Sequence, residues 1–467
     1  MTRAAIDIGR GLAPARPARP IRPGERIHVL GAAGAGASAA ALLAKHAGAD
    51  VSGCDAGRPS PYSAALTDSG IHLAWQHDAA HVDRPAGERP QRLAVTKALT
   101  AINPDHPELL VAHRLGVPTE PWQQLVADAA ATTGQRLVAV AGTHGKSTTA
   151  GWLVDVLVRA ERDPSAFVGA LLDASLTGAT PSTARWGRGD VFVVEADEYA
   201  GNFDAYRPSV IALLNAEWDH PDVFADANAV YDAFANWIRA AENATLVANV
   251  ADEGVRHVME RLTDWPGNVI ELDEAALAHP VGLPGPANAA NARVVAGVAR
   301  LLGVAEPDIA RSLAEFRGVG RRLELKGEVA GVTVLDDYGH HPTAIAKTIQ
   351  AVRERYPDRR LWAVYEPLTY HRTAAMLEQF AEVLAKADEV AIADIWAGRD
   401  PDTTVTSAKA LADAVTGRMG PRATSPGSVE QTADYLATQA RPNDVVLVMG
   451  GGRSYVIAAR LVELLAK

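Results

Sequence analysis

A glycine-rich segment in the middle of the chain carries residue types that bind a nucleoside triphosphate. It reads Gly142-Thr-His-Gly-Lys-Ser147 and follows the apolar run Leu137–Ala141. In such loops glycine lets the backbone approach phosphate oxygens, the lysine reaches the β- and γ-phosphates, and the hydroxyl ligates Mg²⁺. Val140 occupies the place of the usual first glycine, so the loop is a shorter variant. The predicted nucleotide-contacting residues are Gly142, Thr143, His144, Gly145, Lys146, Ser147 and Thr148. The alternative is a plain tight turn.

Acidic residues and a histidine follow the next two apolar runs. Glu195-Ala-Asp-Glu198 comes after Val191–Val194, and a segment ending in Asp219-His220 comes after Val210–Leu214. Carboxylates at strand ends beside a phosphate loop suit Mg²⁺, because hard cations take oxygen ligands. A neutral imidazole at His220 completes a second metal site in this interpretation. The alternatives are a solvated acidic turn and a structural histidine.

A second glycine turn lies near the N-terminus, at Gly31-Ala-Ala-Gly34-Ala-Gly36. It departs from the dinucleotide fingerprint, because Ala33 replaces the second glycine. Asp55 lies near the spacing at which an acidic residue meets a ribose hydroxyl. The turn therefore predicts a site for a nucleotide diphosphate and disfavours an NAD-dependent oxidoreductase.

Polar residues gather again in the last third of the chain. Asp336-Asp-Tyr-Gly-His-His-Pro342 joins an apolar run to a predicted helix, and two acids, two histidines and a tyrosine are costly as packing material. Arg321 and Arg322 lie at an expected hinge and have the geometry to clamp a phosphate. The alternatives are a helix-entry turn and a solvated arginine pair. Asn288 and Asn291 are three residues apart and share a face of a predicted helix.

The elements that must position these residues follow one scheme, used three times: an apolar strand, a glycine turn and a helix. This scheme puts a helix N-terminus at the carboxyl end of a strand, where anions bind. Alternating strands and helices predict an α/β protein. We expect a flexible tail over residues 1–25, a Rossmann-like domain over 26–132, a central P-loop domain with a parallel sheet over 133–319, and a Rossmann-like domain over 320–467.

Composition narrows the functional class. The chain has 467 residues, 48% of them hydrophobic and 22% charged, which is typical of a folded protein of about three domains. A net charge of −11 argues against a nucleic-acid binder. The sequence predicts no membrane span and no secretory signal, so a cytoplasmic protein acting on small molecules, as a monomer or homodimer, is expected. Cys54 is the single cysteine and is expected to be an inert packed thiol.

Taken together and in order, these motifs resemble the Mur ligases, the ATP-dependent amino-acid ligases of peptidoglycan synthesis. The resemblance extends from about Ile27 to the C-terminus. It implies that ATP phosphorylates the carboxylate of UDP-N-acetylmuramate, that L-alanine attacks the acyl phosphate, and that ADP and phosphate leave. ATP and Mg²⁺ are the implied cofactors.

The resemblance also implies roles for individual residues. Lys146 stabilises the migrating phosphoryl group, with Glu195 and His220 as further catalytic residues, and Ser147, Glu195 and His220 are the implied metal ligands. Asn291, Arg322 and Asp337 contact ATP. The implied contacts to the UDP-sugar and the amino acid are Gly31, Gly34, Gly36, Ser38, Asp55, Tyr338, His340 and Arg372.

Three departures from the family pattern concern the acceptor more than ATP. The usual His-Asn-x-x-Asn reads Ala287-Asn-Ala-Ala-Asn291, Ala37 replaces a methionine, and Leu368 and Thr369 replace a basic pair. The alternatives that stay open are a murein peptide ligase of recycling, a ligase with another acceptor, and a non-catalytic nucleotide-binding homologue.

Overall fold

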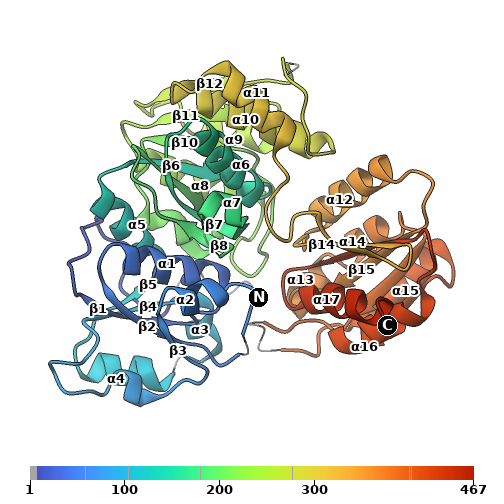
Figure 1. The fold of residues 1–467 in the computed structure, drawn as a ribbon, viewed down its shortest axis with the longest axis horizontal. Coiled ribbons are helices and arrows are strands. Elements are labelled where there is room, and N and C mark those ends of the chain that lie inside the picture. The colour runs from blue at the N-terminus through green and yellow to red at the C-terminus, as the bar shows by residue number, and fades with distance from the viewer. Residues whose placement is uncertain are drawn as a thin grey trace. The chain divides into compact units, whose positions relative to one another are not determined.

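The computed structural model describes residues 8–57, 59–103, 105–178, 180–275, 277–398, 400 and 402–467. The chain divides into two compact units. The first holds the residues up to Asp219, Val223–Gly282 and Ala290–Val319, and the second holds His220–Asp222, Leu283–Ala289 and Gly320–Lys467. The described residues form three sheets, two in the first unit and one in the second, which confirms the predicted three-domain α/β fold (Figure 1).

The first sheet is parallel, with strand order β3-β2-β1-β4-β5. Its strands are β1 (Arg26–Leu30), β2 (Asp50–Cys54), β3 (His72–Ala74), β4 (Arg92–Val95) and β5 (Thr119–Pro121). The connecting helices are α1 (Ala35–His46), α2 (Ala64–Asp68), the 3₁₀ helix η1 (Ala79–His81), α3 (Lys97–Ile102), α4 (Pro107–Arg114) and α5 (Trp122–Thr133). The predicted strand–glycine turn–helix unit is therefore present at β1 and α1.

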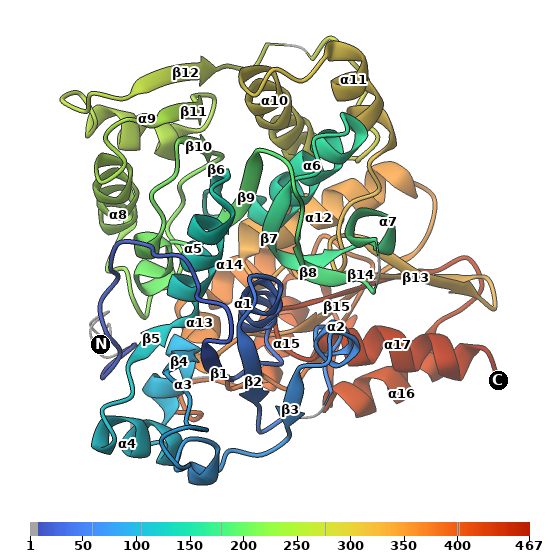
Figure 2. The ribbon, with the colours of Figure 1, turned by 60° about the vertical axis from the view of Figure 1, so that its left-hand side comes forward.

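The second sheet has the order β12-β11-β10-β6-β9-β7-β8, and only β8 among its described strands runs antiparallel to its neighbour (Figure 2). Its strands are β6 (Arg136–Ala141), β7 (Ser165–Leu172), β8 (Ser182–Arg185), β9 (Val191–Ala196), β10 (Val210–Leu213), β11 (Thr245–Asn249) and β12 (Asn268–Leu272). Its helices are α6 (Lys146–Arg159), α7 (Ala174–Thr177), η2 (Tyr199–Ala205), α8 (Ala227–Arg239), α9 (Glu253–Glu260), α10 (Pro286–Leu301) and α11 (Glu306–Glu315). The central strands are continuous apolar runs because helices cover both faces of such a sheet.

The third sheet has the order β13-β14-β18-β15-β16-β17, with β13 antiparallel to β14. Its strands are β13 (Glu324–Val329), β14 (Val332–Asp337), β15 (Leu361–Glu366), β16 (Glu389–Ala393), β17 (Ala423–Gly427) and β18 (Val445–Gly450). Its helices are α12 (Pro342–Arg355), α13 (Tyr370–Ala375), α14 (Leu377–Leu384), α15 (Ala408–Met419), α16 (Val429–Gln439) and α17 (Ser454–Leu465). Helices α13 and α14 are separate, because the backbone at Met376 between them is not helical.

The two sheets of the first unit share one hydrophobic core. Helix α1 packs against α5 of its own sheet and against β7 and β8 of the second sheet. Its alanines at 37, 39, 40, 41 and 44 are buried. Short side chains allow a helix to approach neighbours on two sides, so an alanine-rich helix suits this position.

Residues 8–25 are attached to the first unit, which corrects the expectation of a mobile tail for this stretch. Arg16 forms ion pairs with Glu120 at 2.9 Å and with the buried Asp128 at 2.8 Å. Asp128 also accepts a hydrogen bond from the backbone N–H of Arg19, and Ile21 is buried. The arginines that suggested a disordered tail are thus partners of buried carboxylates.

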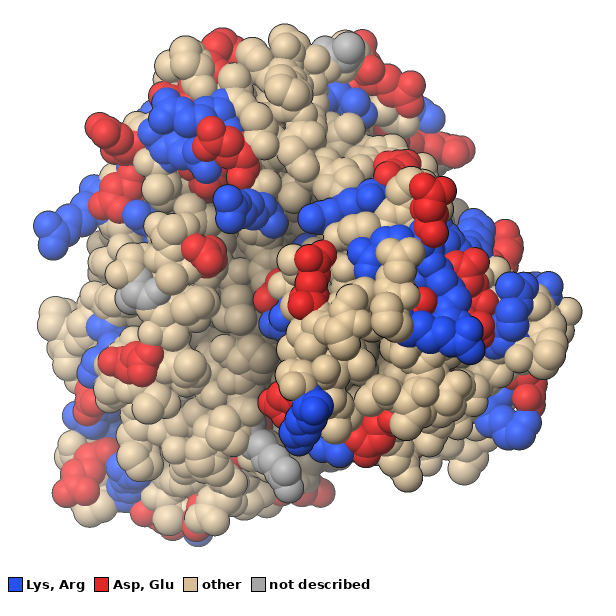
Figure 3. Space-filling view, turned by 45° about the vertical axis from the view of Figure 1, so that its right-hand side comes forward, with Lys and Arg blue, Asp and Glu red and all other residues tan. Residues whose placement is uncertain are grey.

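Acidic and basic side chains lie interspersed over the face in Figure 3. Many of them are paired, for example Arg360 with Asp444 at 2.6 Å and Arg353 with Asp388 at 2.8 Å. Within the described part of the chain, no helix has the length and apolar character needed to cross a membrane.

Candidate active site

The glycine loop of the first unit leaves the carboxyl end of β6, which lies between β10 and β9. Gly145 caps α6 with a left-handed backbone, φ +83°, and the helix begins at Lys146. A Cβ at Gly145 would lie 2.8 Å from Asn291 Oδ1. Only glycine combines this backbone conformation with so close a neighbour. The structure therefore brings Asn291 of α10 beside the loop.

Residues after β10 hold the loop in place. The Asn215 side chain accepts from the His144 N–H at 2.8 Å and donates to the His144 carbonyl at 2.9 Å. The Glu217 N–H donates to Thr143 Oγ1 at 2.9 Å, and the Glu217 carboxylate lies 2.9 Å from His144 Nε2. The sequence analysis gave Asn215 and Glu217 no role. The sequence feature that could have identified them is their position directly after an apolar strand.

Lys146 is half-buried and lies among carboxylates. Its Nζ lies 2.8 Å from Glu198 Oε2 and 3.4 Å from Asp197 Oδ1. Burial alone would lower the pKa of Lys146, but the nearby carboxylates outweigh it and hold that pKa above its ordinary value. The lysine is therefore a fixed positive charge at the loop. Glu198, its main partner, belongs to the acidic segment that the sequence predicts for Mg²⁺, and its contact with Lys146 was not predicted.

Ser147 and Glu195 form a second polar pair at the first turn of α6. Ser147 Oγ donates to Glu195 Oε1 at 3.1 Å, and Glu195 Oε2 accepts from the Gly169 N–H at 2.6 Å. Both side chains are buried. A hydroxyl and a carboxylate oxygen at this separation are the ligand types that Mg²⁺ takes beside a nucleotide, so the pair fits the predicted metal ligands.

Hydrogen bonds to Cys54 and Asp55 hold the N-terminal glycine turn in place. Gly31 has φ +77°, and its N–H donates to the Cys54 carbonyl. Asp55 Oδ2 accepts from the Ala33 N–H at 3.1 Å, so the aspartate fixes the turn. Gly34 is the N-cap of α1, which places a helix N-terminus at the end of β1. This is the arrangement in which anions bind.

Gly36 and Ser38 have packing roles in this structure. A Cβ at Gly36 would overlap the Trp122 ring. The buried Ser38 Oγ donates to the Ala35 carbonyl at 2.9 Å and lies 3.1 Å from Thr183 Oγ1 of β8. Both residues therefore fix α1 against its neighbours and act on the turn indirectly.

In the second unit, the adjacent arginines differ sharply. Arg321 is buried and donates to the Gly450 carbonyl at 2.7 Å and to Ser454 Oγ at 2.8 Å. Arg322 lies over the Tyr338 ring, 4.9 Å from its centroid. Arg321 thus holds the glycine segment after β18, and it also lies over the Tyr338 ring, 5.0 Å from its centroid. Both arginines therefore contact the predicted acceptor-site tyrosine, and only Arg321 is anchored to the end of β18 as well.

The two aspartates at the end of β14 also differ. Asp337 accepts from the Gly339 N–H at 2.7 Å and the Leu323 N–H at 2.9 Å, so it fixes both loops. Asp336 is fully buried beside Arg321, and burial raises the pKa of Asp336 to about 6. Sequence analysis expected a nucleotide contact at Asp337, and the structure gives it a loop-positioning role.

The other predicted residues of this unit lie at helix starts. His340 Nδ1 is 3.0 Å from the Tyr338 carbonyl, and the buried Arg372 of α13 donates to His220 Nδ1 at 3.0 Å. His220, which has φ +56°, is grouped with the second unit. Glu366 is a residue that the sequence analysis left without a role. It is buried at the end of β15, and burial raises its pKa to about 7.

A phosphate loop with a half-buried lysine held by carboxylates, set in a three-domain α/β chain, defines an ATP-using enzyme. Models of three domains match the chain: the Mur ligase family catalytic domain over 26–133, the Mur ligase middle domain over 140–281, and the Mur ligase glutamate ligase domain over 321–452. The chain belongs to the Mur ligase family. It is an ATP-dependent ligase that forms an amide bond, as the resemblance implied.

Individual proteins agree with the family models. The UDP-N-acetylmuramate–L-alanine ligase of Acidothermus cellulolyticus is 34% identical, with 94% of each chain covered. The protein of the same name from Kineococcus radiotolerans is 37% identical, over 95% of this chain and 96% of its own. The solved UDP-N-acetylmuramate-alanine ligase of Thermotoga maritima has the same fold, with a TM-score of 0.76 at 24% identity over 94% of this chain and 98% of its own.

Proposed function

We propose that the chain joins L-alanine to UDP-N-acetylmuramate with cleavage of ATP to ADP and phosphate. The observation that carries the proposal is Lys146, half-buried in a phosphate loop and held at 2.8 Å by Glu198. The names of relatives that match almost the whole chain support the same substrates. The substrates are small molecules, and the proposed setting is the cytoplasm.

The phosphoryl group passes from ATP to the muramyl carboxylate, the alanine amino group attacks the acyl carbon, and phosphate leaves. Phosphoryl transfer needs positioning and charge neutralisation more than covalent help from the protein. Lys146 supplies a positive charge, and the start of α6 supplies helix N–H groups for the phosphates. Asn291, beside Gly145, is the proposed adenine contact, and Arg322 the proposed phosphate contact from the second unit.

Ser147, Glu195 and His220 are the proposed Mg²⁺ ligands. Ser147 Oγ and Glu195 Oε1 lie 3.1 Å apart at the loop, which suits one ion shared between them. A bound Mg²⁺ neutralises charge on the phosphates of ATP. His220 is grouped with the second unit, so its role as a ligand is proposed on the family resemblance alone.

The remaining site residues divide between the two other substrates. Gly31, Gly34 and the start of α1 are proposed to hold the diphosphate of the UDP-sugar, with Asp55, Gly36 and Ser38 fixing that turn. Tyr338, His340 and Arg372 are proposed to contact the amino acid and the reaction intermediate. Leu368 is buried and pairs with Trp396 as an isolated β-bridge, so the position of the family's basic pair is packed here.

Phosphate release from ATP and Mg²⁺ tests the proposal. The reaction contains UDP-N-acetylmuramate and one acceptor: L-alanine, glycine, L-serine or the murein tripeptide. We expect release that requires both the sugar nucleotide and L-alanine, together with a product of the matching mass. Release only with the tripeptide would assign the chain to peptidoglycan recycling, and absence of release with every acceptor would contradict the proposed ligase activity.

A further inference from the structure

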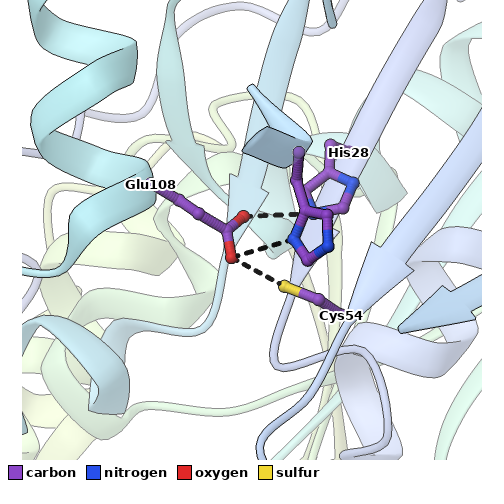
Figure 4. Close-up of side chains that lie close together, drawn as sticks. His28, Cys54 and Glu108 are labelled. Carbon is purple, nitrogen blue, oxygen red and sulfur yellow. Dashed lines mark hydrogen bonds and ion pairs between the residues drawn. The ribbon is translucent and has the colours of Figure 1, made fainter. Parts of the chain in front are cut away.

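Four buried or half-buried side chains of the N-terminal sheet converge away from the glycine loop. They are His28 of β1, Cys54 of β2, His81 of η1 and Glu108 of α4, and we refer to them as the His–Cys–Glu cluster. One ligand atom from each lies within 4.8 Å of the others. Figure 4 shows His28 and Cys54 directed at the Glu108 carboxylate. His28, Cys54 and Glu108 are almost completely buried.

The spacing of these atoms matches ligands that share one metal ion. Cys54 Sγ lies 3.1 Å and His81 Nδ1 3.3 Å from Glu108 Oε1, and His28 Nε2 lies 3.2 Å from Glu108 Oε2. Tetrahedral ligands bound at ordinary zinc distances lie roughly 3.3–3.8 Å apart. Small adjustments of these side chains therefore suffice to surround an ion.

Two buried atoms in the cluster also lack a hydrogen bond. His28 Nδ1 pairs with Ser52 Oγ at 2.9 Å, which directs Nε2 toward Glu108 Oε2. Neither Nε2 nor Oε2 has a hydrogen-bond partner among the described residues, although they lie 3.2 Å apart. We assign the ring proton to Nδ1, facing Ser52, so that Nε2 of the neutral imidazole presents a lone pair to the carboxylate. A cation between the two satisfies both atoms, and an outer hydrogen bond such as that to Ser52 commonly orients a ligating histidine.

We propose that the His–Cys–Glu cluster binds one divalent transition-metal ion of the zinc class. His28 Nε2, Cys54 Sγ, His81 Nδ1 and one oxygen of Glu108 form the four bonds to the ion. The Cys54 thiol loses its proton to solvent on binding, because the thiolate is the ligand. Four protein ligands make a closed structural site rather than a catalytic one.

A metal ion bound at this site would link η1 and α4 to two strands of the N-terminal sheet. η1 and α4 carry His81 and Glu108, whereas β1 and β2 carry His28 and Cys54. His81 is partly exposed, with 14% of its side-chain surface accessible, and provides an entry route. His77 Nδ1 lies 3.2 Å from Cys54 Sγ and orients the thiol from the same loop. None of these residues belongs to the phosphate loop or its partners.

Titration of the full-length, tag-free apoprotein with Co²⁺ tests the site. We expect one ion per chain and a near-ultraviolet charge-transfer band from cobalt–thiolate bonding. Cys54→Ala should abolish that band, and His81→Gln should weaken Co²⁺ binding at least tenfold. His113→Gln, an exposed histidine on the same helix as Glu108, is the matched control and should bind as the wild type does.

Zn²⁺ provides a second readout that is independent of ligase activity. It should displace Co²⁺ in equal amount and raise the thermal midpoint of the wild type but not that of His81→Gln. Absence of equimolar binding, or a wild-type cobalt spectrum without the charge-transfer band, would overturn the proposal. Equal binding by the wild type and His81→Gln would also overturn it, and this variant changes only the partly exposed ligand.

Discussion

At the scale of single residues, Lys146 is preorganised by its neighbours. Its ammonium group lies 2.8 Å from Glu198 and 3.4 Å from Asp197, inside a buried site. A lysine held in this way keeps its charge and pays little reorganisation cost when phosphates arrive.

Replacing Lys146 by alanine should therefore remove catalysis. We expect kcat to fall by roughly 100- to 1000-fold or more, because a charge that acts on the transferring phosphoryl group is lost. Coupled phosphate release measures the effect. Lys409→Ala, at an exposed lysine paired with Asp413, is the control and should keep its activity. Near-normal turnover of the Lys146 variant would contradict the assigned role.

Glu366 is a buried carboxyl whose ionisation works against folding. Burial raises its pKa to about 7, above the ordinary value of 4.5. A group with a raised pKa in the folded state contributes stability below its unfolded pKa, and that stability is lost as pH rises through its folded pKa. Ionisation of Glu366 therefore lowers the free energy of unfolding as pH rises from about 4.5 to about 7, and at pH 8 the full decrease is present.

Glu366→Gln should raise the free energy of unfolding at pH 8 by up to about 3 kcal/mol and change it little at pH 4.5. Denaturant unfolding at both pH values measures the difference. Some pH dependence should remain, because burial also raises the pKa of Asp336 to about 6. The exposed Glu382→Gln is the control. An equal shift at both pH values would show that packing, and not charge, is responsible.

At the scale of elements, chemistry collects where parallel strands end. The loop after β6, the acids after β9 and the polar residues after β10 meet because these strands are neighbours in the sheet. Sequence patterns predicted each strand and each polar segment. They did not predict the hydrogen bonds that join Asn215 to His144, because strand order is a long-range property.

A substitution at Gly145 tests whether the phosphate loop requires glycine at this position. Its left-handed φ of +83° and a would-be Cβ at 2.8 Å from Asn291 Oδ1 both oppose alanine. Gly134, with φ +66° and nothing within 4 Å of a would-be Cβ, shares only the backbone cost. We expect Gly134→Ala to lose about 1 kcal/mol of stability through its backbone conformation, and Gly145→Ala to lose more because of the added contact with Asn291. Only Gly145→Ala should also lose ATP affinity, measured by isothermal titration. Equal ATP affinity in the two variants would show that the loop tolerates a side chain.

At the scale of the whole molecule, the three sheets differ in whether they share a hydrophobic core with a neighbouring sheet. The third sheet has its own core, built from strands β14, β15, β16 and β18 and helices α16 and α17. The first two sheets share a core that includes α1, α5 and strands of both sheets. The predicted boundary at 132 therefore divides two sheets that share a core, whereas the boundary at 319 precedes a sheet with a core of its own.

Two fragments test this difference. Residues 320–467 should unfold cooperatively on their own, because their sheet and core are complete. Residues 26–132 should expose the face of α1 that packs on β7 and β8, and should bind a hydrophobic dye or self-associate. Circular dichroism melts and dye fluorescence measure both. A stable, monomeric 26–132 fragment would contradict the shared core.

The sequence by itself determined the α/β class, the family and the glycine loops, because these depend on local patterns of apolar runs, glycine and polar residues. It misjudged residues 8–25, whose arginines contact carboxylates more than 100 residues away. It also could not predict that Glu198 holds Lys146, that Arg321 is anchored to Gly450 and Ser454, or that His28, Cys54 and Glu108 meet. Those relations depend on which strands become neighbours and on what burial does to charge, and only the tertiary structure decides either.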